Sequence, residues 1–93
     1  MNNKGAHLTE DDLARFQGLG EHQRAVMTIL SKHTKGAYSS DIRRTLKVKS
    51  GVLTASYDGL ERRGLIYRHY SFPPMLLFIQ PTQMAVKYFR GEW

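Results

Sequence analysis

The basic side chains of this sequence are concentrated in the middle of the chain. Residues 32–68 contain nine Lys or Arg residues and three acidic residues. Nine minus three leaves a surplus of six positive charges, equal to the net charge of +6 of the whole chain. Clustered positive charge attracts polyanions, whose counterions are released on binding. The sequence therefore predicts a polyanionic partner; the alternative is a solvated basic face on a small protein.

The other reactive side chains form no pattern that supports catalysis or metal binding. The chain has no cysteine, and its four histidines lack the spacing of metal ligands. Phosphate-loop, serine-hydrolase and zinc-protease motifs are absent from the sequence. His22 and His33 stand at the two ends of one predicted helix, about 16 Å apart along its axis, so they cannot share a metal ion within it. We expect no enzymatic activity, no cofactor and no metal.

Length and composition predict one ordinary globular domain over residues 1–93. The chain is 41% hydrophobic and 24% charged, and its length suffices for one modest core. No apolar run approaches the roughly 20 residues that span a membrane, and the N-terminus lacks the apolar stretch of a signal peptide. We therefore expect no membrane association.

Local signals predict the elements that position the basic residues, beginning with two helices. Residues 1–7 are expected to be flexible. Thr9 can cap a helix over 8–19, and Asp12 stands where the acidic residue of a capping box belongs. A second amphipathic helix follows over 21–33.

The next two helices surround the basic cluster. Ser39 or Ser40 is expected to cap a short third helix that ends at Leu46. After a tight turn, Ser50 is expected to cap a fourth helix over 50–63, and Gly64 fits the left-handed position that ends it.

After Gly64 the apolar pattern changes from helical to strand-like. Residues 21–71 then comprise a helix-turn-helix and a first wing strand, residues 72–80 form the rest of the wing with "SFPP" at its tip, and residues 82–93 form a C-terminal helix that Thr82 caps. The predicted fold is mainly α with a small β-hairpin (α+β), a winged helix-turn-helix with flanking N- and C-terminal helices.

The stretch "IRRTLKVKSGVLTASYDGLERRGLIYR", residues 42–68, resembles the DNA-binding segment of MarR-type winged-helix transcriptional regulators. The positions that agree with that family are Ile42, Leu46, Val48, Leu53, Thr54, Leu60, Glu61, Gly64, Leu65, Ile66 and Arg68. The resemblance covers roughly residues 38–90, but the chain lacks the family's long flanking helices, and its wing tip is apolar where the family's is commonly basic. The resemblance implies a transcriptional regulator that places the helix 50–63 in the major groove of duplex DNA.

The predicted contacts with DNA are mainly contacts with phosphates. The exposed face of the helix 50–63 offers few side chains that read bases, whereas the preceding helix, the turn and the helix start supply cations and backbone N–H groups. The candidate DNA-binding residues are Arg43, Arg44, Lys47, Lys49, Ser50, Gly51, Thr54, Ala55, Arg62, Arg68 and His69.

Other interpretations of these residues remain open. A surface ion pair with Glu61 or Asp58 is the alternative for Arg62, and a solvated face is the alternative for Lys49 and Arg44. Because neighbours on a strand alternate, one of Arg68 and His69 should face solvent.

The terminal helices predict a homodimer, because the last helix has two apolar faces where a short surface helix needs one. The candidate interface residues are Leu13, Phe16, Met84, Tyr88 and Trp93. The alternative is that Tyr88 and Phe89 both cover the small core from one side.

The sequence favours a dimeric DNA-binding transcriptional regulator in the cytoplasm, associated with the nucleoid if its source is bacterial or archaeal. The alternative is a winged-helix protein-interaction module that docks through "SFPPMLL" and the terminal helices within a larger assembly. RNA binding ranks third, because no aromatic signature of an RNA-binding sheet is found.

Overall fold

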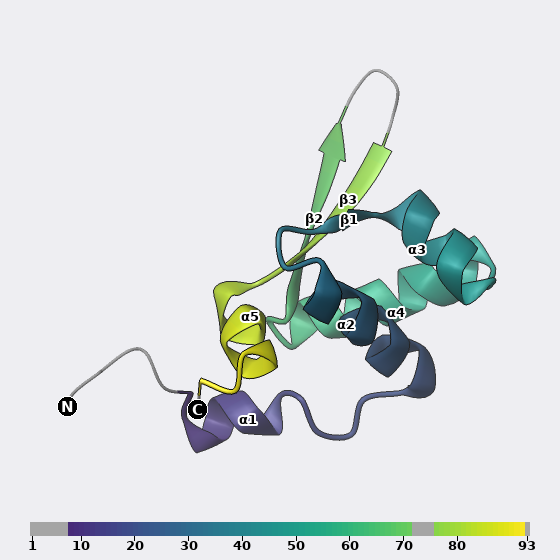
Figure 1. The fold of residues 1–93 in the computed structure, drawn as a ribbon. Coiled ribbons are helices and arrows are strands. Elements are labelled where there is room, and N and C mark those ends of the chain that lie inside the picture. Colours follow the sequence, from purple (N-terminus) through teal and green to yellow (C-terminus); the bar gives the residue numbers. More distant parts are fainter. Residues whose placement is uncertain (1–7, 72–75, 93) are drawn as a thin grey trace.

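The structure is a computed structural model that describes residues 8–71 and 76–92. Its elements are α1 (Glu10–Ala14), α2 (Glu21–Lys32), β1 (Ala37–Tyr38), α3 (Ser39–Leu46), α4 (Ser50–Arg62), β2 (Ile66–Ser71), β3 (Leu76–Pro81) and α5 (Gln83–Phe89). The strands form an antiparallel sheet in the order β1-β3-β2. Figure 1 shows the β2–β3 hairpin projecting from the helices, with α3 and the start of α4 at one end and α1 and α5 at the other. The predicted α+β winged-helix architecture is confirmed.

The core lies where α2 and α4 meet the inner face of the sheet. Leu53, Tyr57 and Leu60, which helical spacing places on one face of α4, are at most 2% exposed, as the sequence predicted. They pack against apolar side chains of the other elements. The partners in this cluster include Val26, Met27, Leu30, Ile42, Leu65, Ile66, Ile79 and Ala85. This packing fixes α4, because a helix of this length is marginal in water by itself.

The predicted capping box of the N-terminal helix is confirmed. The Thr9 hydroxyl accepts a hydrogen bond from the Asp12 N–H, and the Asp12 carboxylate accepts one from the Thr9 N–H, both at 3.1 Å. The predicted length, residues 8–19, is wrong because α1 ends at Ala14. The next three residues form only turns with the residue three positions earlier, and Gly18 then turns the chain at a φ of +70°.

The predicted serine caps of α3 and α4 are wrong. Ser39 and Ser50 are the first helical residues, and the caps are Tyr38 and Lys49, which make no side-chain capping bond. The Ser39 hydroxyl instead lies 2.8 Å from the Tyr57 hydroxyl. A partner on another helix has replaced the local capping interaction.

Two left-handed residues end α3 and α4. Lys47, which follows α3, has a φ of +56° and is the single non-glycine residue with positive φ in the described part of the chain. Gly64, with a φ of +74°, ends α4 as predicted. The Leu65 N–H donates to the Leu60 carbonyl and the Gly64 N–H to the Glu61 carbonyl, the two bonds of a Schellman motif. These turns set the directions of α4 and β2.

The C-terminal helix begins where the sequence predicts and ends earlier. The Thr82 hydroxyl accepts from the Ala85 N–H at 3.3 Å and donates to the Gly64 carbonyl at 2.8 Å, so it joins α5 to the end of α4. Helix α5 stops at Phe89 instead of continuing to residue 93. The predicted wing tip at 72–75 and Trp93 lie outside the described residues. Within the described ranges, no helix is long and apolar enough to cross a membrane.

Candidate nucleic-acid interface

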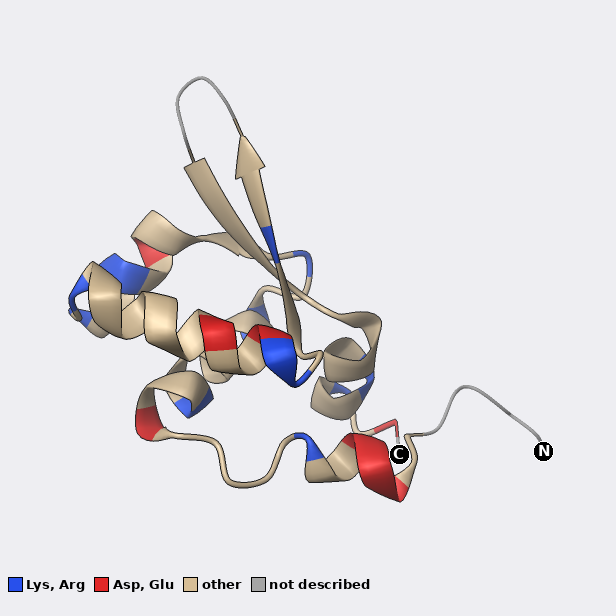
Figure 2. Ribbon diagram, turned by 180° about the vertical axis from the view of Figure 1, so that it is seen from behind, with Lys and Arg blue, Asp and Glu red and all other residues tan. Residues whose placement is uncertain are grey.

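A basic cluster lies where α3 turns into α4. Arg43, Lys47 and Lys49 are exposed, and none of them is ion-paired with a residue in the described ranges. Figure 2 shows this concentration of basic residues at one end of the molecule, beside the start of α4. The close approach of the three residues follows from the short left-handed turn at Lys47. Their charges are therefore available to bind a polyanion.

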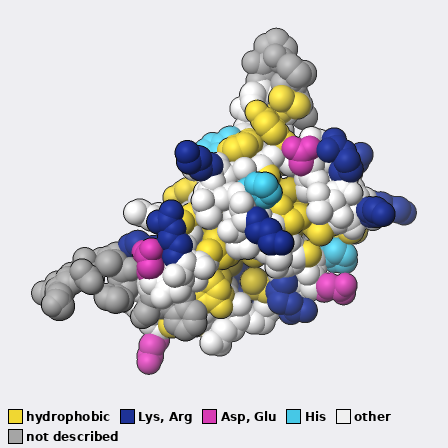
Figure 3. Space-filling model, viewed as in Figure 1, with side chains coloured by type: hydrophobic (Ala, Val, Ile, Leu, Met, Phe, Trp, Pro, Cys, Tyr) yellow, Lys and Arg dark blue, Asp and Glu magenta, His cyan; other side chains and the backbone are white. Residues whose placement is uncertain are grey.

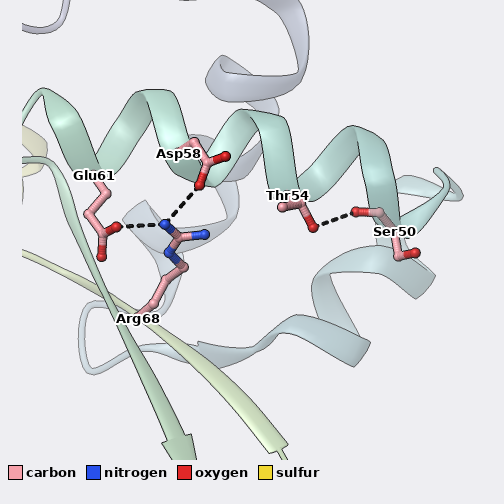
Figure 4. Close-up of polar contacts among 5 residues, drawn as sticks. All are labelled: Ser50, Thr54, Asp58, Glu61 and Arg68. Atoms are coloured by element: carbon pink, nitrogen blue, oxygen red, sulfur yellow. Dashed lines mark hydrogen bonds and ion pairs between the residues drawn. The ribbon is translucent and has the colours of Figure 1, made fainter.

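The start of α4 is itself suited to an anion. Its first turn contains no acidic residue, and no side chain caps it. The positive end of the helix dipole and the first N–H groups therefore face outward beside Lys49. The Thr54 hydroxyl donates to the Ser50 carbonyl at 3.1 Å, inside the helix (Figure 4). This bond leaves the Ser50 hydroxyl and the Thr54 methyl as the groups available to a ligand.

A hollow of about 320 Å³ separates α3 from the start of α4. The residues that line it are Ser39, Ser40, Arg43, Ser50, Leu53, Thr54, Tyr57 and Leu77. The structure thus brings together Arg43, Ser50 and Thr54, three of the predicted DNA contacts. Burial raises the pKa of Tyr57, whose hydroxyl meets that of Ser39, so this hydroxyl remains neutral. A guanidinium among several hydroxyls can donate multiple hydrogen bonds to a phosphate.

Arg44 does not join this group. Its guanidinium lies 2.9 Å from the Asp41 carboxylate, in a pair whose side chains are 75% and 57% exposed. Arg44 and Asp41 line a second hollow together with Tyr38 and Phe78. The structure therefore places the neighbouring Arg43 and Arg44 at two different surfaces, because successive helical positions point about 100° apart.

The outward face of α4 carries small side chains. Gly51, Ala55 and Thr54 are exposed, and Val52 is 37% exposed. Small residues let a helix approach a surface closely, and the methyl groups of Thr54 and Ala55 can contact thymine methyls. Arg62 is exposed at the far end of α4 and has no ion pair with a described residue.

The acidic residues near Arg62 pair with Arg68 on β2 instead. The Arg68 Nη2 lies 2.8 Å from an Asp58 carboxylate oxygen and 2.6 Å from a Glu61 carboxylate oxygen (Figure 4). The Arg68 side chain is 18% exposed, whereas those of Asp58 and Glu61 are 47% and 43% exposed. The hydrogen bond to Glu61, the largest effect, raises the pKa of Arg68; burial opposes it, and the interactions with Asp58 add to it. Arg68 thus offsets the negative charge of two residues on α4.

The strand geometry explains why Arg68 and His69 differ. The side chain of Arg68 points toward α4, on the same face of β2 as the buried Ile66, and the exposed His69 points the opposite way. The predicted alternation is confirmed. His69 Nε2 lies 2.9 Å from the Gln80 side-chain oxygen, on the outer face of the sheet. The two predicted DNA contacts therefore lie on opposite faces of the hairpin.

Arg63, which was not predicted as a site residue, holds the N-terminal segment in place. Its Nη1 donates to the carbonyls of Arg15 and Gln17 at 3.0 and 2.6 Å, and the Arg15 guanidinium donates to the Arg63 carbonyl at 3.0 Å. No local sequence signal marks this interaction, because the two arginines are 48 residues apart.

Two of the predicted interface residues contact each other within the chain. The rings of Phe16 and Tyr88 stack with centroids 3.8 Å apart and planes 6° apart. Met84 packs against the core and Leu13 is half-buried. The stack joins the segment after α1 to α5 and forms one combined surface from the two ends of the chain.

Two comparisons with known proteins find nothing, and a third finds the same fold. No protein-family model matches the chain, and no curated protein matches it. The structure resembles the crystal structure of AbfR of Staphylococcus epidermidis, a MarR-family regulator, with a TM-score of 0.71 and 25% identity. The match covers 88% of this chain and 55% of that chain, so this chain spans about half the length of AbfR.

A transcriptional regulator homologue protein from Pyrococcus horikoshii OT3 matches with a TM-score of 0.71 and 20% identity, over 89% of this chain and 86% of that chain. The predicted resemblance to MarR-type winged-helix regulators is confirmed at the level of the fold.

Proposed function

We propose that this protein is a DNA-binding transcriptional regulator that places α4 in the major groove of duplex DNA. The observation that carries the proposal is the cluster of Arg43, Lys47 and Lys49 at the uncapped start of α4, where no described acidic residue pairs with them. Two structures with the same fold belong to proteins described as transcriptional regulators or their homologues, which supports the same class of function.

Binding depends mainly on phosphates in this proposal. Arg43 beside the hydroxyl-lined hollow, Lys47 in the turn and Lys49 at the helix start contact the backbone on one side of the groove. Arg62 is 12 residues beyond Ser50, about 18 Å along the helix, and reaches the other side. The small residues between them allow close approach, and the sequence preference comes largely from DNA shape.

Arg68 has a different role from the one expected of a DNA contact. Asp58 lies on the groove-facing side of α4, where a carboxylate repels phosphates. From its position on β2, Arg68 offsets part of the negative charge of Asp58 and Glu61, and its two ion pairs hold α4 against β2. His69 faces away from α4 and takes no part in this mode of duplex binding.

Fluorescence anisotropy of a labelled random duplex of about 30 base pairs, titrated at several salt concentrations, tests the proposal. We expect micromolar affinity with a steep dependence on salt. Lys49→Ala should lower the salt slope by about 0.9, the contribution of one phosphate contact. Arg44→Ala should lower it less, because Asp41 already offsets its charge.

A matched control separates a local contact from a general effect of charge. Arg90→Ala removes the same charge from an exposed position just after α5, away from the proposed surface, where the guanidinium lies 4.0 Å from the Glu92 carboxylate. It should leave the slope unchanged. Equal losses for Lys49→Ala and Arg90→Ala, or no binding at low salt, would contradict the proposed site.

The homodimer through the terminal helices remains part of the proposal. The stack of Phe16 on Tyr88 unites the two ends of the chain in one surface, and a two-fold dimer would present two α4 helices to half-sites about 34 Å apart. Sedimentation velocity should then give twice the chain mass of 10.7 kDa. A monomer at all concentrations that saturate DNA would refute this part.

The second candidate function is a protein-interaction module. It is favoured by the exposure of Tyr70 and Leu76 on the hairpin, which are 56% and 39% exposed, since apolar surface of this kind often marks a protein contact. Failure to bind duplex DNA at low salt would favour this candidate.

A further inference from the structure

The outer face of the sheet carries a row of aromatic side chains that crosses all three strands. Tyr38 on β1 and His69 on β2 are both register partners of Phe78 on the central strand β3. The ring centroids of Tyr38 and Phe78 are 5.1 Å apart, and those of His69 and Phe78 are 6.5 Å apart. Tyr67, two residues before His69 on the same strand, extends the row with a centroid distance of 6.2 Å. We call these four residues the aromatic row.

The aromatic row is accessible and does not belong to the core. Tyr38 and Tyr67 are 42% and 53% exposed, whereas Ile66 and Ile79 on the opposite face of the same strands are at most 1% exposed. The rings are tilted by 44° to 70° relative to one another. Because the rings are tilted and not stacked in parallel, the exposed parts of the Tyr38 and Tyr67 rings can accept other planar groups.

Basic residues lie close to the β1 end of the aromatic row, in the hollow beside Tyr38 or a few positions earlier in the chain. Arg44 lines a hollow of about 470 Å³ together with Tyr38, Phe78, His33 and Asp41, whose carboxylate lies 2.9 Å from the Arg44 guanidinium. Lys32 and Lys35, in the segment that leads into β1, are exposed and make no ion pair with any residue in the described ranges. In Figure 3, hydrophobic side chains extend up the hairpin, and Lys, Arg and His side chains lie around its base.

We propose that the aromatic row binds a segment of single-stranded nucleic acid. Unpaired bases stack on aromatic rings exposed on a sheet, while nearby cations contact the phosphates. Tyr67 and Tyr38 provide the outermost rings, the hollow beside Tyr38 accommodates one base, and Lys35, which has no ion pair with a described residue, contacts the backbone. A protein partner fits less well, because the flanking cations would be desolvated without a complementary charge.

This site is independent of the proposed duplex-binding surface. The aromatic row points away from α4, because His69 and Tyr67 alternate along β2 with Arg68, whose side chain contacts α4. A duplex on α4 and a single strand on the sheet therefore occupy opposite faces of the hairpin. The two activities can be lost separately.

Anisotropy of a labelled oligonucleotide of about 15 thymidines, which forms no duplex, tests the proposal. Tyr67→Leu should weaken its binding about tenfold, the effect of losing roughly one stacked base, whereas Tyr67→Phe should retain it. Tyr70→Leu is the matched control, because Tyr70 lies on the same strand, is 56% exposed and points to the opposite face. It should leave oligonucleotide binding unchanged.

The duplex serves as the second readout. Tyr67→Leu should leave the affinity for the random duplex unchanged, and Lys49→Ala should weaken duplex binding more than oligonucleotide binding. The proposal is overturned if the wild-type protein does not bind the oligonucleotide at low salt. It is also overturned if Tyr67→Leu and Tyr70→Leu weaken binding equally, or if only Lys49→Ala weakens it, since the strand would then occupy the surface of α4.

Discussion

Replacing Arg68 by Met should weaken duplex binding without removing a contact to DNA. In the structure, one guanidinium nitrogen lies 2.8 Å from Asp58 and 2.6 Å from Glu61. The three side chains together carry one positive and two negative charges, a net charge of −1. Met preserves much of the aliphatic packing of Arg68 but leaves a net charge of −2 on α4.

The expected magnitudes follow from these distances and exposures. Exposed ion pairs contribute about 0.2–1 kcal/mol each, and these two join half-exposed carboxylates to a largely buried Arg68, so their loss should lower the free energy of unfolding by at least about 0.4–2 kcal/mol. One extra negative charge about 10 Å from a phosphate costs about 0.4 kcal/mol in water. Repulsion from two or three phosphates then amounts to about 1 kcal/mol, or a Kd about fivefold higher at low salt.

The decisive variant also removes the two carboxylates. The triple variant Arg68→Met, Asp58→Asn and Glu61→Gln has no net charge at this cluster, so its duplex affinity should equal or exceed that of the wild type. Urea denaturation of both variants is the control that each is folded at the temperature of the binding assay. If the triple variant binds as weakly as Arg68→Met, then Arg68 itself contacts the DNA and the reasoning is wrong. The defect of Arg68→Met should also diminish with added salt, because salt screens the repulsion.

Two further predictions concern the turn before α4 and the buried tyrosine. Lys47→Gly should keep or raise the free energy of unfolding, by up to about 1 kcal/mol, because glycine adopts the φ of +56° without strain. The same variant should lower the salt slope of duplex binding by about 0.9; a clear loss of stability in urea would show that the Lys47 side chain has a structural role. Tyr57→Phe removes the 2.8 Å hydrogen bond with Ser39 and should cost about 0.5–1.5 kcal/mol. Because burial raises the pKa of Tyr57 in the folded state, its contribution is fully present below the unfolded value of about 10 and falls as the pH rises through the folded value. The stability difference between wild type and Tyr57→Phe should therefore shrink in urea titrations above pH about 10, and a constant difference would contradict this assignment.

The parts of the fold that local chemistry controls could be predicted from the sequence. Thr9 and Asp12 form their capping box because the two residues are three positions apart and need no distant partner. Gly64 ends α4 because glycine adopts left-handed φ without strain. The same holds for the buried face of α4, since Leu53 and Tyr57 follow the helical period.

The predictions failed where a distant partner replaced a local one. Ser39 was expected to cap α3, but its hydroxyl meets that of Tyr57, 18 positions further along the chain. The helix expected over 8–19 ends at Ala14. Its following turn is held by Arg63, which is 48 positions from Arg15. Such partners cannot be read from spacing, because only the packed helices bring them within hydrogen-bond distance.

The candidate nucleic-acid interface could likewise be predicted only in part from the sequence. The sequence by itself determined that positive charge gathers around α3 and α4, because the positions of Lys and Arg along the chain are known without the fold. It also determined that Arg68 and His69 face opposite sides of the sheet, because successive side chains on a strand alternate. The tertiary structure decided which charges remain available: Arg68 is bound to Asp58 and Glu61, whereas Arg43 makes no ion pair with any residue that the structure describes.

Tertiary structure also created the aromatic row. Tyr38 and Phe78 are 40 positions apart and meet only through the register of β1 on β3. No linear motif reveals such a surface, because hydrogen bonds between strands, and not the order of residues, place its members side by side.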